Sequence, residues 1–254
     1  MAFPEIIKGY TQSDGQLAQR IVELGHSSVA AFQRWNGVPE TSTIDEATRD
    51  ILARRRCAVP DIIPEGAAGK SAKWLFKDVT SAHRVSLPTI GREQVNEAWR
   101  LSVRRWTEVC GISFTVTEDW GAANVYANSG RIDGAGGVLA WSYLPSDSGR
   151  DERIEQLFDD RENWNFEFLL EVATHELGHS IGIGHINRSG NIMHPYAVGN
   201  KQLGPQDIEE AVARYGPREE PVPPQPPPQP PGGGSAILNG SVDGKNYVFI
   251  GIQV

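Results

Sequence analysis

The fold of this chain is decided by the segment His175-Glu176-Leu177-Gly178-His179-Ser180-Ile181-Gly182-Ile183-Gly184-His185. It reads H-E-x-x-H-x-x-G-x-x-H, which is the spacing of a zinc-centred hydrolytic site. On a helix, His175 and His179 project from one face, and Glu176 lies beside the metal, rotated by about 100°. Gly182 can adopt the positive φ that ends a helix, so the chain can return His185 as a third ligand. Three protein nitrogens leave the fourth tetrahedral position open for water. This is typical of one catalytic zinc, with Glu176 as general base.

A methionine follows the third histidine. Asn191-Ile192-Met193-His194-Pro195-Tyr196 matches the Met-turn, a tight turn that places a methionine beneath the zinc ligands of metzincins. A buried methionine on its own is usually part of a core. Its position downstream of the zinc motif, followed by Pro-Tyr, favours Met193 as a structural residue under the site.

A cysteine far upstream could close the open zinc position. Cys57 lies in Arg56-Cys57-Ala58-Val59-Pro60-Asp61. A thiolate is a stronger zinc ligand than water, so Cys57 delivered to the zinc would complete an inactive site. The alternative is an inert buried thiol. Cys110 lies on an apolar helix face and is expected in the core. Because a disulfide would remove the switch, we predict that both cysteines are free.

Two upstream motifs make the chain resemble the matrixins, the matrix metalloproteinases. The residues Arg55–Asp61 are similar to the family's cysteine switch P-R-C-G-x-P-D, and Ala31–Thr41 with Ile44-Asp45 is similar to its propeptide signature F-Q-R-x-x-G-L-x-x-T-G-x-L-D. The resemblance covers residues from about 25 to 216. It implies a zinc metalloendopeptidase made as a latent zymogen, with Cys57 as a zinc ligand in the latent form and Arg56 paired with Asp61.

The switch motif departs from the family pattern at two positions. Arg55 stands where the family has Pro, and Ala58 stands where it has Gly. Ala58 can follow the family's backbone path only if its φ stays negative. We therefore expect the latch, meaning the switch segment Arg55–Asp61 that holds Cys57 at the zinc, to be looser than in the family. Cleavage within Arg54–Arg56 would leave Cys57 on the mature enzyme, so we interpret this run as solvated surface. Activation cleavage is expected near Lys70 or Lys73, which would leave Trp74 close to the mature N-terminus.

The resemblance also implies one or more calcium ions. Asp133-Gly134-Ala135-Gly136-Gly137 and Phe158–Trp164 match the family's D-G-P-G-G and F-D-x-D-E-x-W segments, which clamp calcium between carboxylates and loop carbonyls. The alternative is a Gly-rich turn beside an acidic loop. The calcium ligands carried over from the family are Asp133, Gly134, Gly136, Val138, Asp159 and Glu162.

The family's second, structural zinc is expected to be absent. That site needs three histidines and an aspartate, and the chain has no histidine between residues 84 and 174. Two of the positions that should carry histidine are Trp141 and Leu157. Without imidazole ligands, the surrounding loop must be held by packing and calcium.

The hydrophobic pattern predicts an α+β fold. Amphipathic segments predict prodomain helices over residues 17–24, 28–34 and 45–55. The next part of the chain carries strand signals at 85–87, 112–116, 125–127 and 138–142, and helix signals at 91–110, 166–181 and 205–215. Here the resemblance implies a metzincin catalytic domain, with a twisted, mostly parallel sheet and three helices. A proline-rich tail follows.

Four segments result from this pattern. Residues 1–68 form a helical propeptide that resembles peptidoglycan-binding modules and carries the switch, and residues 69–216 form the catalytic domain. Residues 217–234 are a Pro/Gly-rich linker. Residues 235–254 carry Asn-Gly and Asp-Gly turn signals and resemble either a partial hemopexin-like blade or a disordered tail.

Composition limits the partners. The net charge of −8 over 254 residues excludes the basic footprint of a nucleic-acid-binding protein. The sequence contains no apolar run long enough to span a membrane. We expect a monomer that acts on protein or peptide substrates. Residues 1–10 lack the basic and apolar regions of a secretory signal, whereas the resemblance implies an extracellular protein. Either the signal was lost or trimmed, or the protein stays inside the cell.

Substrate is expected to lie extended and antiparallel along the strand Val138-Leu139-Ala140. The resemblance implies that Leu139, Ala140, Pro195 and Tyr196 contact it, and that Glu171, four residues before the first ligand, walls the main specificity pocket. A carboxylate there would favour Lys or Arg. The alternative is a Glu171 side chain turned to solvent. Ile186, after the third ligand, is atypical for the family.

A binding protein is the competing hypothesis. Because the propeptide signature resembles peptidoglycan-binding modules, the chain could be a polymer-binding protein with an inactive zincin domain. The complete set of zinc ligands and the retained Glu176 argue against this, because an inactive domain would not need the base.

Overall fold

The computed structural model describes residues 12–63, 73–146, 153–200, 202–218, 237–242 and 245–250. Its contacts divide the chain into two units, residues 1–221 and residues 222–254. The boundary predicted at residue 68, the cleavage position Lys70 and most of the predicted linker lie outside the described residues.

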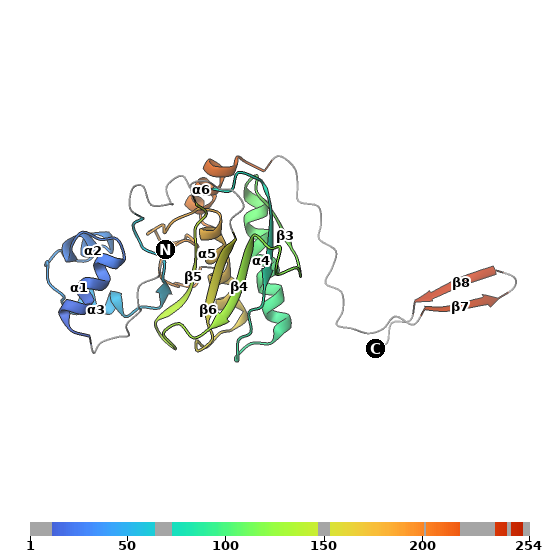
Figure 1. The fold of residues 1–254 in the computed structure, drawn as a ribbon, viewed down its shortest axis with the longest axis horizontal. Helices are drawn as coiled ribbons and strands as arrows, with labels where there is room; N and C mark the ends of the chain where they lie inside the picture. Colours follow the sequence, from blue (N-terminus) through green and yellow to red (C-terminus); the bar gives the residue numbers. More distant parts are fainter. Residues whose placement is uncertain are drawn as a thin grey trace. The chain divides into compact units, whose positions relative to one another are not determined.

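Three short helices form the prodomain, as the hydrophobic pattern predicts (Figure 1). They are α1 (Asp14–Glu23), α2 (Val29–Trp35) and α3 (Glu46–Leu52). Each begins after a side chain that accepts a backbone N–H of the first turn, namely Ser13, Ser28 and Asp45. Helix α3 ends before residue 55, where helix was expected, and the chain then enters strand β1 (Arg56–Cys57). A small core is shared by Leu17, Ile21, Leu24, Phe32, Ile51, Leu52 and Tyr196.

A six-stranded sheet follows, in the order β1-β5-β6-β4-β2-β3 (Figure 1). Its other strands are β2 (Asp78–His83), β3 (Ser113–Val116), β4 (Val125–Gly130), β5 (Val138–Ser142) and β6 (Ile154–Asp159). All neighbouring strands are parallel except β5 and β6, which are antiparallel. The predicted mostly parallel sheet is confirmed.

Two strand assignments differ from expectation. The predicted strand at residues 85–87 is wrong. The Ser129 hydroxyl accepts the N–H of Ser86 and donates to the carbonyl of Ser86, each at 2.9 Å, so these backbone groups bond to a side chain and not to a neighbouring strand. Val85 and Leu87 are buried in the core without joining the sheet. Strand β6 was not predicted as a strand, and it lies in the sheet between β4 and β5.

Three helices complete this part, at nearly the predicted positions: α4 (Arg92–Val109), α5 (Phe166–Ser180) and α6 (Pro205–Tyr215). Helices α4 and α5 pack against each other, and the indole N–H of Trp106 donates to the carbonyl of Thr174 at 2.8 Å. Asn165 caps α5 through the N–H of Phe168. Because α5 is buried from Leu169 to Ser180, its polar residues must find partners inside the protein.

The second unit contains an antiparallel hairpin of β7 (Ile237–Val242) and β8 (Lys245–Ile250). Asn239-Gly240, taken as a turn signal, lies inside β7. The Asp-Gly pair at 243–244 lies between the two strands, outside the described residues. The resemblance to a hemopexin-like blade stays a prediction.

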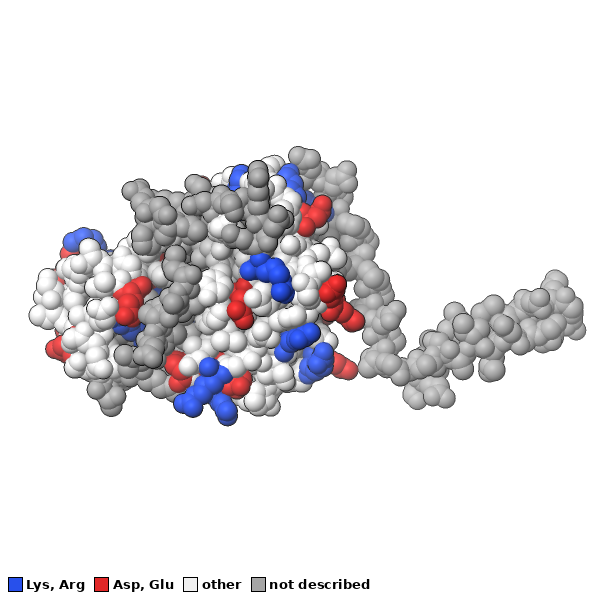
Figure 2. All heavy atoms as spheres, viewed as in Figure 1, with Lys and Arg blue, Asp and Glu red and all other residues white. Residues whose placement is uncertain are grey.

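Charged side chains of both signs are interspersed on the face shown in Figure 2. Within the described part of the chain, no helix is long and apolar enough to cross a membrane.

Candidate metal centre and active site

Helix α5 and the turn after it carry the three predicted ligands. His175 and His179 lie one turn apart on the buried helix. The helix ends at Ser180, Ile181 is its C-cap, and Gly182 adopts a φ of 87°. Only a residue without Cβ takes this conformation at low cost, so Gly182 reverses the chain and brings His185 back to the other two rings. The predicted helix-ending role of Gly182 is confirmed.

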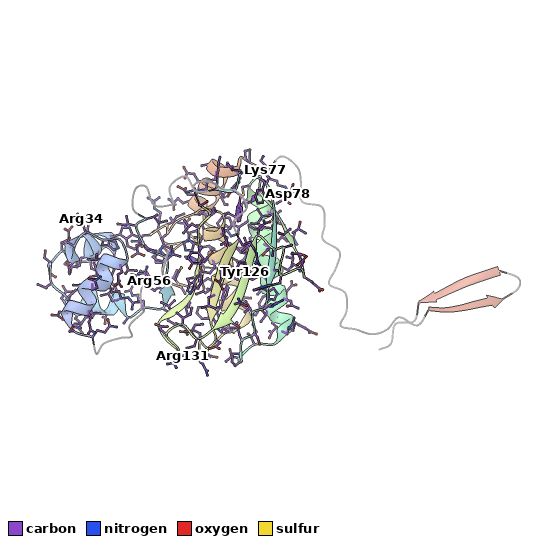
Figure 3. All side chains as sticks on the ribbon, viewed as in Figure 1. Arg34, Arg56, Lys77, Asp78, Tyr126 and Arg131 are labelled. Carbon is purple, nitrogen blue, oxygen red and sulfur yellow. The ribbon has the colours of Figure 1, made fainter. Side chains whose placement is uncertain are left out.

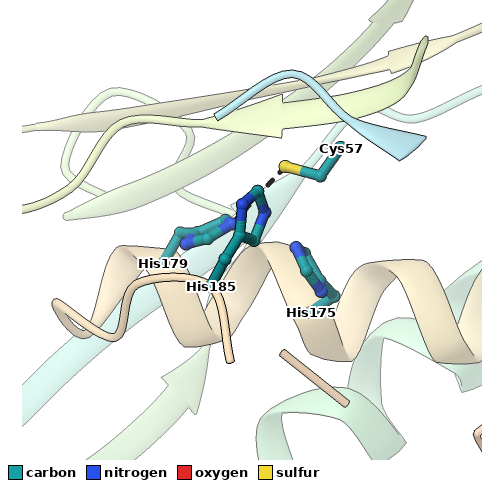
Figure 4. A group of neighbouring side chains, drawn as sticks. All are labelled: Cys57, His175, His179 and His185. Carbon is teal, nitrogen blue, oxygen red and sulfur yellow. Dashed lines mark hydrogen bonds between the residues drawn. The ribbon is translucent and has the colours of Figure 1, made fainter. Parts of the chain in front are cut away.

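Four ligand atoms meet above this helix (Figure 4). One atom each from Cys57, His175, His179 and His185 lies within 4.8 Å of the others. Among the described residues this is the one group of three or more His, Cys, Asp or Glu side chains arranged to hold a metal ion. The Sγ of Cys57 approaches from the propeptide and lies 3.4 Å from Nε2 of His179.

The donor set fits a zinc ion. Nδ1 of His175 lies 2.7 Å from the carbonyl of Ile192, and Nδ1 of His179 lies 2.8 Å from the carbonyl of Ile183. A carbonyl only accepts, so each Nδ1 carries the proton and each Nε2 is left with a free electron pair. Nε2 of His175 and of His185 are buried without a hydrogen-bond partner, as expected of metal-facing atoms.

Burial keeps these imidazoles neutral. Burial, with a smaller contribution from the neighbouring His185, lowers the pKa of His175 to about 3. Burial also holds the pKa values of His179 and His185 below the ordinary value. Neutral imidazole is the form that binds metal. Three neutral nitrogens and one sulfur are a tetrahedral donor set that zinc accepts.

Glu176 lies next to the ligands without being one of them. Its Oε2 is 3.7 Å from Sγ of Cys57, and its Oε1 is buried without a hydrogen-bond partner. Burial raises the pKa of Glu176 to about 8. A divalent cation nearby would favour the ionised carboxylate, which is the form a general base needs.

Met193, which the sequence placed under the site, packs against helix α5 at Gly178. It is fully buried, and a Cβ at Gly178 would collide with its Sδ and come within 2.8 Å of Trp106. Gly178, the second x of H-E-x-x-H, must therefore be glycine so that Met193 and Trp106 can pack closely against the helix. Sequence reasoning did not identify what holds the turn. Asp207 accepts the N–H groups of Ile192 at 2.6 Å and Met193 at 3.1 Å.

The propeptide strand occupies the edge of the sheet beside the ligands. The N–H of Cys57 donates to the carbonyl of Pro195 at 3.1 Å, and the N–H of Ala58 donates to the carbonyl of Ala140 at 3.1 Å. β1 runs parallel to β5, opposite to the direction expected for substrate. Ala58 keeps a negative φ, so it fits the backbone path without strain, and the expected loosening has no basis in its conformation.

Arg56 is buried, which corrects the interpretation of Arg54–Arg56 as solvated surface. Only 1% of Arg56 is exposed, and Figure 3 places it between the prodomain helices and the sheet. Its guanidinium donates to both carboxylate oxygens of Asp61 and lies over the Tyr196 ring at 5.1 Å. Although burial opposes ionisation, Arg56 holds the pKa of Asp61 well below its usual range.

A pocket lies next to the ligand cluster. Leu139, Glu171, Pro195 and Tyr196 line it together with Cys57, His175 and Glu176, and Ala140 lies in the neighbouring strand. Only 8% of Glu171 is exposed, so its side chain is not turned to solvent. Its Oε1 accepts the N–H groups of Val198, Gly199 and Asn200 at 2.9–3.1 Å. Sequence reasoning missed this anchoring of the 198–200 loop.

The residues predicted to bind calcium lie in one loop cluster. Asp159 Oδ2 accepts the N–H groups of Ile132, Asp133 and Gly134, and Glu162 Oε1 accepts that of Gly136 at 2.5 Å. Asp133 accepts the N–H of Val138 at 3.1 Å. All three carboxylates are buried. They form hydrogen bonds to the backbone of the loop. Their oxygen atoms do not converge on one point as the ligand atoms of Cys57 and the three histidines do.

The two positions where the second zinc would need histidine face each other in the sheet. Trp141 on β5 pairs with Leu157 on β6. The Trp141 ring packs edge to face on Tyr143 at 5.2 Å. Aromatic and aliphatic packing therefore occupies this place, and the absence of a second zinc stays a prediction.

Comparison with known proteins gives one family. The sequence profile of the matrixins matches residues 73–216. Interstitial collagenase of Sus scrofa is 31% identical over 208 residues, covering 76% of this chain and 43% of the collagenase. Hatching enzyme of Paracentrotus lividus is 30% identical over 207 residues, covering 75% of this chain and 34% of that enzyme. Matrix metalloproteinase-20 of Homo sapiens is 28% identical over 235 residues, covering 84% of this chain and 47% of that protein. The chain thus spans less than half the length of these relatives.

Proposed function

Because the chain belongs to the matrixin family, we propose that it is a zinc metalloendopeptidase made as a latent zymogen. The observation that supports this most directly is the cluster of His175, His179 and His185 with Cys57. Glu176 lies within 3.7 Å of the same sulfur. The proposed ligands of the single catalytic zinc are the three histidines, with Cys57 as the fourth ligand in the latent form.

The proposed reaction is hydrolysis of an internal peptide bond. Zinc at this position would polarise the scissile carbonyl and lower the pKa of the attacking water. Glu176 accepts the proton of that water and returns it to the nitrogen of the leaving amine. The carbonyls of Ile192 and Ile183 hold the His175 and His179 rings in the required tautomer. Met193 packs against helix α5 at Gly178, which lies between the two helical ligands in sequence.

Substrate binding is proposed along β5, in the place of the propeptide. The carbonyls of Gly137 and Ala140 accept N–H groups of Arg56 and Ala58 in the latent form. An extended peptide running antiparallel would use the same backbone groups of Val138, Leu139 and Ala140. Pro195 and Tyr196 would border it on the opposite side, since the Pro195 carbonyl accepts the N–H of Cys57.

The proposed function is tested by zinc content and casein digestion, measured before and after modification of the thiol. We expect one zinc per chain throughout, little digestion before modification and strong digestion afterwards, because the Cys57 sulfur can then no longer bind the metal. A chain that binds zinc and stays inactive after Cys57 is fully modified would favour a polymer-binding protein. A metal-free chain purified without chelators would exclude the enzyme.

We also propose that Glu171 selects basic side chains in the pocket beside the zinc. Its carboxylate is buried at the pocket wall, and one oxygen is held by three N–H groups. A negative charge in a site of low dielectric favours a cationic partner. Peptide-library profiling should show Lys or Arg preferred after the scissile bond, and Glu171→Gln should reduce that preference about tenfold, which corresponds to ~1.4 kcal/mol. A purely aliphatic preference that is unchanged in Glu171→Gln would contradict this.

Calcium binding at the 132–138 loop is proposed on the family pattern and on charge. Asp133, Asp159 and Glu162 are buried together, and the nearby guanidinium of Arg55 is 3.9 Å from Glu162 and about half exposed. Buried carboxylates are stabilised by a cation with oxygen preference. Millimolar calcium should raise the melting temperature by several degrees, and Asp159→Asn should remove that rise. An equal rise in Asp159→Asn would mean that calcium binds elsewhere.

The remaining assignments rest on the family resemblance and on the sequence. We propose an extracellular monomer that acts on proteins or peptides and is activated by cleavage near Lys70 or Lys73. The N–H of Trp74 donates to the Tyr215 hydroxyl at 3.1 Å, and that hydroxyl donates to the carbonyl of Ile181 at 3.0 Å. The segment after such a cut is therefore joined through the Tyr215 hydroxyl to the end of helix α5.

A further inference from the structure

The three ligand histidines differ in what orients them. Nδ1 of His175 and of His179 each face a carbonyl of the catalytic domain itself. Nδ1 of His185 makes no hydrogen bond of ordinary geometry among the described residues. Its polar neighbour is Oδ1 of Asp61, at 3.2 Å, and both side chains are fully buried. Asp61 belongs to the predicted propeptide, so the ring of this one ligand faces a propeptide carboxylate.

Asp61 is itself held firmly inside the prodomain. Its Oδ2 lies 3.1 Å from Nε2 of His26, and both side chains are fully buried. The His26 ring packs edge to face on Phe32 and Trp35 at 5.2 and 5.3 Å. The N–H of Asp61 donates to the carbonyl of Leu24 at 2.9 Å.

A glycine allows this close approach. Gly25 has a φ of 91°, and a Cβ there would collide with the carbonyl of Ile62. The segment 61–62 can therefore lie directly against the end of helix α1. Together with the Arg56 guanidinium, these contacts leave the Asp61 carboxylate little freedom to turn away from His185.

We propose that Asp61 is a positioning residue for the metal ligand His185, so that the propeptide retains zinc as well as blocking it. This rests on the proposed zinc site. A carboxylate facing the outer nitrogen of a ligand imidazole fixes the ring and raises its basicity. The latch then has two independent parts: the Cys57 sulfur, which occupies the open position, and Asp61, which orients the third ring. His26 supports Asp61 from the prodomain side.

The two parts can be separated by a double-mutant cycle in the full-length chain. All proteins carry Glu176→Ala, so that no autolysis occurs during the measurement. The cycle compares this parent with its Cys57→Ser, Asp61→Asn and double variants, and the readout is the rate of zinc loss to a chromophoric chelator. Asp61→Asn should speed zinc loss about 10- to 100-fold. It should do so in the Cys57→Ser background as well, because its effect passes through His185 and not through the thiol.

Controls make the outcome decisive. Asn187→Ala removes a contact between the catalytic domain and the Trp35 carbonyl without touching Asp61, and it should leave the rate unchanged. His26→Gln should shift the rate in the same direction as Asp61→Asn, and it serves if Asp61→Asn does not fold. An Asp61 or His26 effect that disappears in Cys57→Ser would overturn the proposal, because Asp61 would then act only through the thiol. A parent that binds no zinc would instead overturn the proposed function itself.

Discussion

After the latch is opened, the Glu176→Ala enzyme is expected to keep its zinc and to digest casein at least ~10²- to 10⁴-fold more slowly than the wild type. The reason is geometric. Glu176 is buried beside the ligand cluster, but its carboxylate is not among the four atoms that face the metal position. Its removal takes away the proton acceptor while the three imidazoles and their carbonyl partners stay in place.

Glu118→Ala is a suitable control, because Glu118 is an exposed acid outside the site. It should bind zinc and digest casein as the wild type does. Zinc content and thermal unfolding, measured on both variants, separate loss of the base from loss of structure. Normal digestion by Glu176→Ala would exclude Glu176 as the base.

The part of the site that could be predicted is local in sequence. His175, Glu176 and His179 share one helix, and a single glycine with positive φ returns His185. Helical periodicity and one turn preference therefore determine the ligand set. Met193 follows shortly afterwards, so it too could be identified from spacing alone.

What could not be predicted depends on contacts between distant segments. Asp61 meets His185, and Glu171 anchors the 198–200 loop through three N–H groups. No spacing or periodicity in the sequence indicates that these residues will contact each other. The pairing of Arg56 with Asp61 was implied by the family resemblance, but the burial of Arg56 was not, because arginine in a basic run is typical of the surface. Here Asp61 and the Tyr196 ring cover it.

The same holds for the strands. Val138–Ser142 was predicted at its observed bounds because its apolar run is continuous. Strand β6 carries the polar residues Glu155 and Gln156, and Gln156 is fully buried and donates to the Ser180 hydroxyl at 2.7 Å. A buried polar residue breaks the apolar pattern of a central strand. Its position becomes understandable only when helix α5 is packed beside it.

Cys57→Ser should turn the latent chain into one that digests casein without any thiol treatment. The Sγ of Cys57 lies among the ligand nitrogens, 3.4 Å from His179 Nε2. A serine hydroxyl is a far weaker zinc ligand than a thiolate, since it does not ionise near neutral pH. The backbone of β1 still pairs with β5, so the propeptide would remain docked for part of the time. Even ~1.4 kcal/mol of lost latch stability raises the open population about tenfold.

Cys110→Ala provides the matched control, because Cys110 is the other buried cysteine and is not among the four residues grouped to hold a metal ion. Its Sγ lies 3.4 Å from the carbonyl of Trp106, in the core beside helix α4. Cys110→Ala should lower the melting temperature and leave latency intact, whereas Cys57→Ser should weaken latency enough to give casein digestion at a nearly unchanged melting temperature. Casein digestion before thiol modification distinguishes them. If Cys57→Ser and the wild type are equally inactive, the strand pairing of Arg56–Ala58 with Gly137 and Ala140 blocks the site by itself, and the thiol is not the switch.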